Sequence, residues 1–196
     1  MFKKRKIIAI SGISGSGKSS LAYKLAVILN GTHRDQDSDY KQNKPKVKLS
    51  NGVIKSNWDT LEAINLEEMN KKLRIPGLVF LSGFALSDDV FENDNKPDIH
   101  IHLVISKELS LQTRLAIKNF KDDEKDTQVL VFNELVYPFY QLTLSKSTID
   151  IFINVESDTQ KHTRRSFDDL LDEIIEYLKT KLDLKHFSNI NLSNGL

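Results

Sequence analysis

The residues best suited to chemistry lie in one short segment, Gly12–Ser20, with the sequence GISGSGKSS. Its glycines allow the backbone to turn tightly, so that successive amide groups can point into one concavity that suits an anion. The lysine would add a mobile cation for the outer phosphates of a nucleotide, and the serine after it a hydroxyl for Mg²⁺. The segment therefore predicts a phosphate-binding loop. The expected nucleotide-binding residues within it are Gly12, Ser14, Gly15, Ser16, Gly17, Lys18, Ser19 and Ser20.

Both flanks of this loop have the character that it needs. The apolar run Ile7–Ile10 predicts a strand that is buried on both faces, as in a parallel sheet. The segment Lys18–Asn30 predicts a helix with an apolar face, whose positive N-terminal end would face the same concavity. A chance turn rich in Gly and Ser is the alternative, and the complete motif between correct flanks disfavours it.

A carboxylate follows the next expected strand. Residues 32–36 predict a short, polar strand, and Asp37 comes directly after it. Ligands of open α/β sheets bind beyond the carboxyl ends of the strands, so Asp37 is placed to face the phosphates. The alternative interpretation is an acidic turn. We expect the neighbouring Asp39 to be solvated.

A second acidic segment, Asn57–Thr60, precedes an amphipathic stretch that predicts a helix ending at Ile75–Gly77. Asp59 has two interpretations, a cap of that helix or a ligand of a sugar diol. Trp58, the only tryptophan, is either a core residue or a residue that stacks on a substrate.

Further along the chain, the alternation of residues 98–105 predicts a strand with His100 and His102 on one face. Metal ligation would need a third ligand, so we favour a polar sheet edge or a pair satisfied by hydrogen bonds. The charged stretch 119–128 is either the tip of a movable lid or an exposed loop. The other expected elements are a buried strand at 78–81, a helix at 106–118 capped by Ser106, a helix near Pro138, a strand at 149–155 and an amphipathic helix at 167–181.

Composition limits the classes of function. Of the 196 residues, 39% are apolar and 28% are charged, which suits one domain with its own core. We expect that domain to span residues 1–183 and to be followed by a flexible tail, 184–196. A net charge of +1 disfavours bulk attraction to nucleic acid or to a membrane. The absence of cysteine excludes disulfides and thiol nucleophiles and fits a cytoplasmic protein. The oligomeric state has no signal in the sequence.

Three segments together resemble the nicotinamide riboside kinases, within the uridine kinase-like group of P-loop kinases. They are the phosphate-binding loop, Gln36–Lys41 (QDSDYK) and Asn57–Asn65 (NWDTLEAIN). The resemblance implies a three-layer α/β P-loop NTPase fold, with a mostly parallel sheet flanked by helices and a lid at about residues 114–130. It also implies ATP and Mg²⁺ as cofactors, and the primary hydroxyl of a ribonucleoside-like substrate as the phosphoryl acceptor.

The resemblance assigns roles to individual residues. The catalytic aspartate of the family maps onto Asp37, which would take or orient the proton of the acceptor hydroxyl. Lys18 would act with it on the transferred phosphate, and Arg114 would steady the phosphates from the lid. Ser19 and Asp37 would hold the metal ion. Ile117 and Lys118 stand where the family's lid has further arginines.

The substrate side of the site follows from the same resemblance. The family's ribose-binding aspartate maps onto Asp59, with Trp58 and Tyr40 as further substrate-binding residues. Ser82 stands at the end of a buried strand where the family has glutamate. A neutral hydroxyl is a weaker metal ligand than a carboxylate, so we expect weak magnesium dependence and slow turnover. Phosphorylation of uridine or another small metabolite, and non-catalytic nucleotide binding, are the alternatives.

Overall fold

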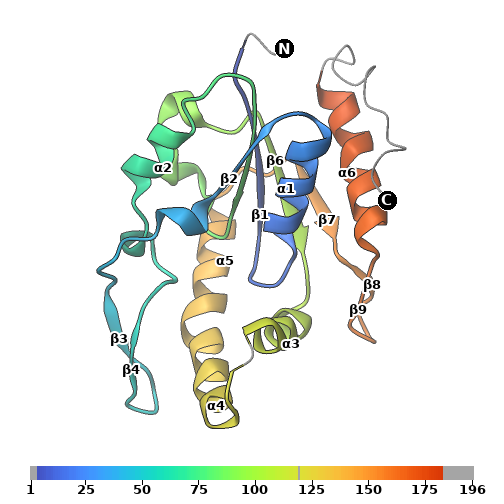
Figure 1. Ribbon diagram of the computed structural model, residues 1–196. Coiled ribbons are helices and arrows are strands. Elements are labelled where there is room, and N and C mark those ends of the chain that lie inside the picture. The colour runs from blue at the N-terminus through green and yellow to red at the C-terminus, as the bar shows by residue number, and fades with distance from the viewer. Residues whose placement is uncertain (1–3, 119, 183–196) are drawn as a thin grey trace.

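The centre of the protein is a five-stranded sheet whose strands are all parallel, in the order β2-β5-β1-β6-β7 (Figure 1). The structure is a computed structural model that describes residues 4–118 and 120–182; the expected tail, 184–196, lies outside the described residues. The strands of this sheet are β1 (Lys6–Gly12), β2 (Thr32–Asp35), β5 (Leu78–Gly83), β6 (Ile99–Val104) and β7 (Ile151–Asn154).

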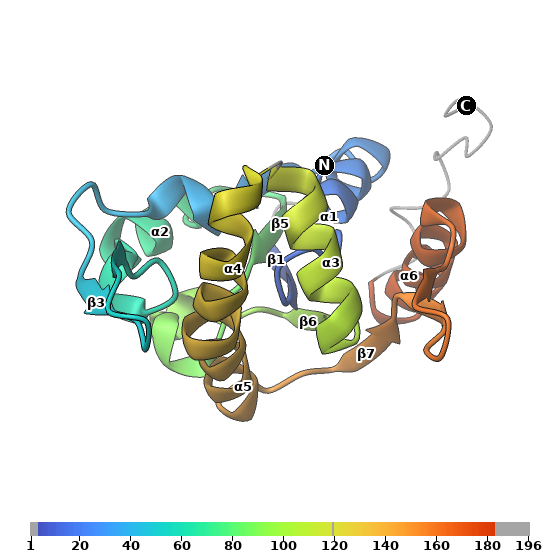
Figure 2. The same cartoon turned by 90° about the horizontal axis from the view of Figure 1, so that it is seen from below.

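Helices cover both faces of the sheet and so produce three layers. The α-helices are α1 (Lys18–Ile28), α2 (Leu66–Lys72), α3 (Lys107–Lys118), α4 (Asp122–Val131), α5 (Tyr137–Ser145) and α6 (Phe167–Lys181). Helices α1 and α6 lie on one face, and α2 and α5 lie on the other (Figures 1 and 2). Helices α3 and α4 lie beyond the carboxyl ends of the strands (Figure 2).

The short elements lie mostly around that same edge. Two hairpins are formed by β3 (Lys46–Lys48) with β4 (Ile54–Ser56) and by β8 (Glu156–Asp158) with β9 (Thr163–Arg164). The short helical turns are η1 (Gln36–Asp39), η2 (Leu61–Ala63), η3 (Asp88–Val90), η4 (Asn93–Asn95) and η5 (Phe132–Val136), the last being a π-helical turn.

The central position of β1 explains its unbroken apolar run. It pairs with β5 on one side and with β6 on the other, and both of its faces are covered. Ile8 and Phe80 belong to the core on the side of α1, whereas Ile7 and Val79 belong to the core on the side of α2. Successive residues of the run Ile7–Ile10 therefore pack against helices on opposite faces of the sheet, which explains why all four are apolar.

The structure corrects the single helix that was expected after the segment Asn57–Thr60, with Asp59 or Thr60 as its cap. The segment forms the short turn η2 and then, separately, α2, which is capped by the Asn65 side chain accepting from the amide of Glu68 at 3.2 Å. The two pieces are separated because Ile64 is extended and bridges to Tyr40. The interpretation of Asp59 as the cap of this helix is therefore wrong.

The expected lid segment contains a helix where a loop was the alternative. Helix α4 begins at Asp122 and passes through the π-turn η5 into α5. Pro138 lies in the first turn of α5, where its missing N–H and its ring interrupt the preceding turn. The widened turn directly before Pro138 accommodates that interruption without ending the helix.

Asp39 is also different from expectation, because it is buried rather than solvated. Its carboxylate pairs with the ammonium of Lys72 on α2, and its backbone carbonyl accepts from the amide of Asn65 at 2.8 Å. These contacts fix η1 against α2, so that the segment after β2 is held at the carboxyl edge of the sheet.

Candidate functional site

The phosphate-binding loop connects β1 to α1 and has the backbone that its glycines predict. Gly15 and Gly17 have φ values of 82° and 91°, in the left-handed region that favours glycine. A side chain on Gly12 would lie 2.7 Å from Oγ of Ser16 and 2.9 Å from the carbonyl oxygen of Leu103. Gly17 is the N-cap of α1. The first helical amides of α1 therefore begin directly at the loop, an arrangement that suits an anion.

The predicted polar residues of the loop lie where phosphate would be held. Lys18, Ser19 and Ser20 form the first turn of α1. The hydroxyl of Ser16 is buried and has no hydrogen-bond partner among the described residues. Buried polar atoms normally have a partner, and a phosphate oxygen in the loop would supply one. The loop thus fits the phosphates of a nucleotide.

Helix α3 holds the tip of the loop from outside. The Ser110 hydroxyl donates to the carbonyl oxygen of Ser14 at 2.7 Å, and Nη1 of Arg114 donates to the Ser14 hydroxyl at 3.3 Å. The buried Nε of Arg114 has no partner within the described part of the chain. The arginine expected to steady phosphate therefore lies beside the loop, with a donor still available.

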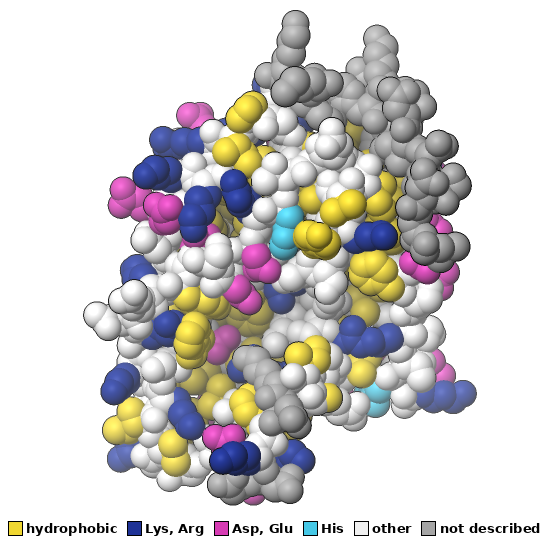
Figure 3. Space-filling model, in the orientation of Figure 1, with side chains coloured by type: hydrophobic (Ala, Val, Ile, Leu, Met, Phe, Trp, Pro, Cys, Tyr) yellow, Lys and Arg dark blue, Asp and Glu magenta, His cyan; other side chains and the backbone are white. Residues whose placement is uncertain are grey.

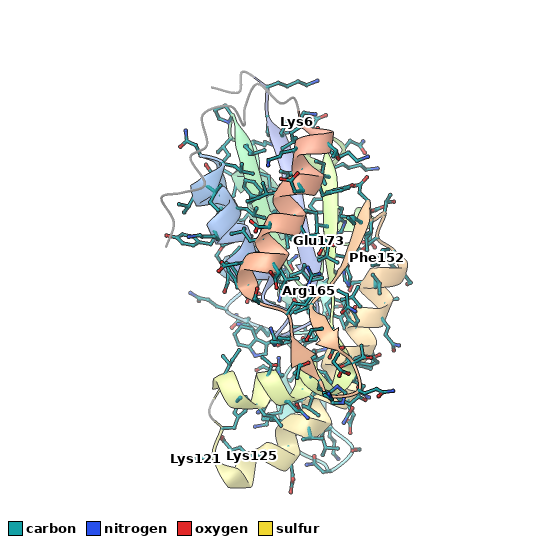
Figure 4. All side chains as sticks on the ribbon, turned by 90° about the vertical axis from the view of Figure 1, so that its right-hand side faces the viewer. Lys6, Lys121, Lys125, Phe152, Arg165 and Glu173 are labelled. Carbon is teal, nitrogen blue, oxygen red and sulfur yellow. The ribbon has the colours of Figure 1, made fainter. Side chains whose placement is uncertain are left out.

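A second arginine, Arg164 on β9, reaches the loop from the β8–β9 hairpin. Its guanidinium donates to the carbonyl oxygen of Gly15 and, at 3.0 Å, to the Thr113 hydroxyl. The hairpin is fixed to α6, because Nη1 of Arg165 pairs with the Glu173 carboxylate at 2.5 Å (Figure 4). No motif surrounds Arg164 in the sequence, so only the folded hairpin reveals its position.

Three residues predicted as site residues, Asp37, Asp59 and Arg114, act electrostatically on Tyr40, which is itself a predicted site residue. Burial raises the pKa of Tyr40 above its usual range, and the negative charges of Asp37 and Asp59 raise it further. The positive charge of Arg114 acts on the same hydroxyl and opposes them. Asp37 lies in η1, directly before Tyr40, whereas Asp59 and Arg114 come from distant segments: Asp59 follows the Trp58 ring that meets Tyr40, and Arg114 contacts Ser14 of the loop.

Trp58 completes this side of the site. Its ring meets the Tyr40 ring edge-on, with centroids 5.1 Å apart, and 48% of the residue is exposed. It is therefore not the core residue that one interpretation expected. The ammonium of Lys44 lies 3.7 Å from the Trp58 ring centroid and donates to the Lys41 carbonyl at 2.6 Å. The positive charge of Lys44 thus lies over the Trp58 ring.

The end of β5 carries Ser82, and the strand beside it carries a carboxylate. Ser82 is fully buried, and its hydroxyl lies 3.0 Å from Nε2 of His33. Burial lowers the pKa of His33, and the charge of Asp35 partly opposes this. Asp35 pairs directly with Ser82 in the strand register, and its side chain accepts from the amide of Asp37 at 3.0 Å. Asp35 has no recognisable signal in the sequence, because only the pairing of β2 with β5 places it beside Ser82.

Metal binding by protein groups alone is not supported in the described ranges, where no group of three His, Asp or Glu residues is arranged to hold an ion. Mg²⁺ usually takes only one or two protein carboxylates, with waters and substrate phosphates. Ser19, Asp35 and Asp37 are oxygen donors at the phosphate edge and fit that mode. Figure 3 shows a hollow in the lower half of the displayed face, with Asp or Glu side chains on its rim.

Comparison with known proteins gives one local match in sequence. A nicotinamide riboside kinase from Schizosaccharomyces pombe is 32% identical over 73 residues, which are 37% of this chain and 31% of that protein. The match therefore spans about a third of the length of that curated relative. No model of a protein family matches the chain.

Solved structures match over most of the chain. A gluconokinase from Sinorhizobium meliloti 1021 superposes with a TM-score of 0.50 at 17% identity, covering 90% of this chain and 97% of that one. A shikimate kinase from Acinetobacter baumannii, in complex with shikimate, gives 0.51 at 16% identity, covering 91% and 95%. The chain has the α/β P-loop NTPase fold. The predicted fold class is confirmed, and at such identities the likeness shows the fold alone.

Across residues 4–118 and 120–182, no helix combines the length and the apolar character needed to cross a bilayer.

Proposed function

We propose that the protein is a kinase that uses ATP and Mg²⁺ to phosphorylate the primary hydroxyl of a ribonucleoside-like substrate. The observation that carries this proposal is an arrangement at one edge of the sheet: Asp37 follows β2 in η1, Asp59 follows the Trp58 ring that meets Tyr40, and Arg114 contacts Ser14 of the phosphate-binding loop. Nicotinamide riboside is the substrate named by the local sequence match, and it is the first acceptor to test.

In this proposal the phosphate side works by positioning and by charge. The loop amides, Lys18 and the start of α1 hold the β- and γ-phosphates, while Arg114 approaches from α3. Ser19 and the carboxylates after β2 supply oxygen ligands for Mg²⁺, which when bound offsets the negative charge that develops on the phosphates. Most of the rate enhancement of phosphoryl transfer comes from such preorganised contacts.

The acceptor side uses the two aspartates differently. Asp59 holds the ribose diol beside the Trp58 ring. Asp37 is exposed at the carboxyl edge. It takes the proton of the substrate's primary hydroxyl while the oxygen of that hydroxyl forms a bond to the γ-phosphorus of ATP. The bond between that phosphorus and the bridging oxygen breaks, and ADP leaves with the electron pair.

A second candidate, a nucleotide-binding protein without catalysis, is favoured by one observation. Ser82, which replaces the family's glutamate, is fully buried and bonded to His33, so it does not face a metal ion as a carboxylate would. Both candidates bind nucleotide through the phosphate-binding loop, so ATP binding does not distinguish them. Only the kinase releases ADP with an acceptor, so turnover measurements separate the two.

The test is a panel of ribonucleosides with ATP and Mg²⁺, in which ADP release is followed beside ATP affinity. Lys18→Ala should weaken ATP binding at least about tenfold while the melting temperature stays unchanged, because charge-assisted contacts to phosphate are lost. Lys24→Ala, which removes a lysine from the same helix, is the matched control and should bind ATP normally. ATP binding without turnover of any acceptor would favour the second candidate. Unchanged ATP affinity in Lys18→Ala would refute both.

A further inference from the structure

A connected set of buried polar side chains lies behind the phosphate-binding loop. Ser11, the residue before Gly12, has its hydroxyl 2.7 Å from Nε2 of His100 and 2.8 Å from Nδ1 of His102. The Nε2 atom of His102 lies 2.9 Å from the hydroxyl of Tyr140 on α5. The two histidines on one face of β6 are therefore both satisfied by hydrogen bonds, through the Ser11 hydroxyl that they share. We call Ser11, His100, His102 and Tyr140 the Ser11 network.

One assignment of hydrogens satisfies every atom of the Ser11 network. His100 is also hydrogen-bonded to the backbone of Thr148, which makes its Nδ1 the donor and its Nε2 an acceptor. Ser11 then donates to His100 and accepts from Nδ1 of His102, and Tyr140 donates to Nε2 of His102. Both imidazoles are neutral in this arrangement. In agreement, burial lowers the pKa of His100 and lowers that of His102 to about 4.

All four side chains of the Ser11 network are buried, and neighbouring groups hold them in place. The Phe152 ring on β7 meets the His102 ring edge-on at a centroid distance of 5.6 Å; Figure 4 shows Phe152 on that edge strand. The charged groups that face it are Asp88 and Asp150, both near His100. Asp150 accepts from the His100 backbone amide at 2.7 Å and so fixes β6 at this level.

The Tyr140 end of the network lies on α5, close to the residue that follows β5. The Tyr140 ring stacks on His102 at 5.7 Å and lies 6.3 Å from the Phe84 ring, just beyond the end of β5. Helix α5 continues from α4 through η5, and α4 lies beyond the carboxyl edge of the sheet (Figure 2). A displacement of α5 would therefore reach Ser11 through two hydrogen bonds.

We propose that the Ser11 network positions the phosphate-binding loop, so that Ser11, His102 and Tyr140 are positioning residues for nucleotide binding and phosphoryl transfer. The loop begins with a glycine, which has no side chain to hold its own backbone, and the loop amides act only if they are fixed before the phosphate arrives. Ser11 is the last β1 residue with a side chain. One of its hydrogen bonds leads through His102 to Tyr140 on α5, and the other fixes it to His100 on β6. The inference rests on the proposed function only in that the loop binds nucleotide.

The test compares Ser11→Ala and Tyr140→Phe with Tyr137→Phe, a matched control on the same helix. Among the residues that the structure describes, the Tyr137 hydroxyl forms no hydrogen bond. Its ring packs near Phe132. ATP affinity, kcat, KM and melting temperature are measured for each protein. Ser11→Ala and Tyr140→Phe should lower ATP affinity or kcat by about tenfold or more, as loss of groups that orient a site usually does. Tyr137→Phe should stay within about twofold.

A purely structural network would give a different result. If Ser11→Ala and Tyr140→Phe lower the melting temperature but keep ATP affinity and kcat within about twofold, the proposal is wrong. If Ser11→Ala does not fold, Tyr140→Phe decides, because it removes a single oxygen at the far end of the network. ATP affinity remains a valid readout even if no ribonucleoside is phosphorylated, so a failure of the kinase assignment is distinguishable from a failure of this proposal.

Discussion

Lowering the pH from about 7.5 to about 5 should reduce the free energy of unfolding by about 2 kcal/mol through His102 alone. Burial, and then the neighbouring His100, lower the pKa of His102 from 6.5 to about 4. Between these two values the unfolded chain binds a proton that the folded protein does not. Stability is therefore fully present above the unfolded pKa and is lost as the pH falls toward the folded one, with a limit of about 3 kcal/mol.

The assay is urea unfolding over a series of pH values, with the protein and His102→Gln compared at each pH. Other titrating groups, including His33 and His100, are present in both proteins, so they largely cancel in the difference. The stability advantage of the unmodified protein should shrink steadily as the pH falls below about 6.5. A difference that stays constant from about pH 7.5 to about pH 5 would show that His102 titrates normally, and the neutral hydrogen-bond assignment of the Ser11 network would be refuted.

Three further substitutions test the site. Asp59→Ala should raise KM for the ribonucleoside at least about tenfold and leave the melting temperature and ATP affinity unchanged, because Asn65 caps α2; equal losses for both ligands would contradict a diol-binding role. Ser82→Ala should cost about 1 kcal/mol in urea unfolding through the lost contact with His33. Its magnesium titration should be unchanged, because in the proposed site the carboxylate near the metal comes from Asp35; a large shift in half-saturation would contradict this. Lys44→Ala should lower KM for a cationic pyridinium riboside relative to uridine, because it removes a positive charge from the Trp58 ring; an unchanged KM ratio would show that Lys44 does not select the base.

The fold is predictable from the sequence where the signal is local. The Ile7–Ile10 run and the loop after it define a buried parallel strand and its helix, because glycine conformation and strand burial depend on neighbouring residues. The helix start at Asn65 is not predictable in this way. It depends on the bridge between Ile64 and Tyr40, which joins segments far apart in the chain.

The candidate site divides in the same manner. Asp37 and Asp59 are recognisable from their short motifs; in the structure Asp37 lies in η1, directly before Tyr40, and Asp59 follows the Trp58 ring that meets Tyr40. Asp35 becomes meaningful only when β2 pairs with β5, and Arg164 only when the β8–β9 hairpin folds against the loop. The burial of Asp39 is not predictable from its neighbours, because its partner, Lys72, comes from a different helix.

The central place of β1 in the sheet has a consequence for how the protein is made. Its neighbours are β5 and β6, so its register is set by Leu78–Gly83 and Ile99–Val104, which are synthesised much later than the phosphate-binding loop. Contacts of such sequence separation form slowly, because a long loop must close before they are gained. Until Val104 has left the ribosome, β6 cannot pair with β1, and the loop that starts at Gly12 is not fixed. Nucleotide affinity should therefore arise late and abruptly during synthesis. Nucleotide added to a refolding chain would then speed only the last steps of assembly, after the sheet has already closed around β1.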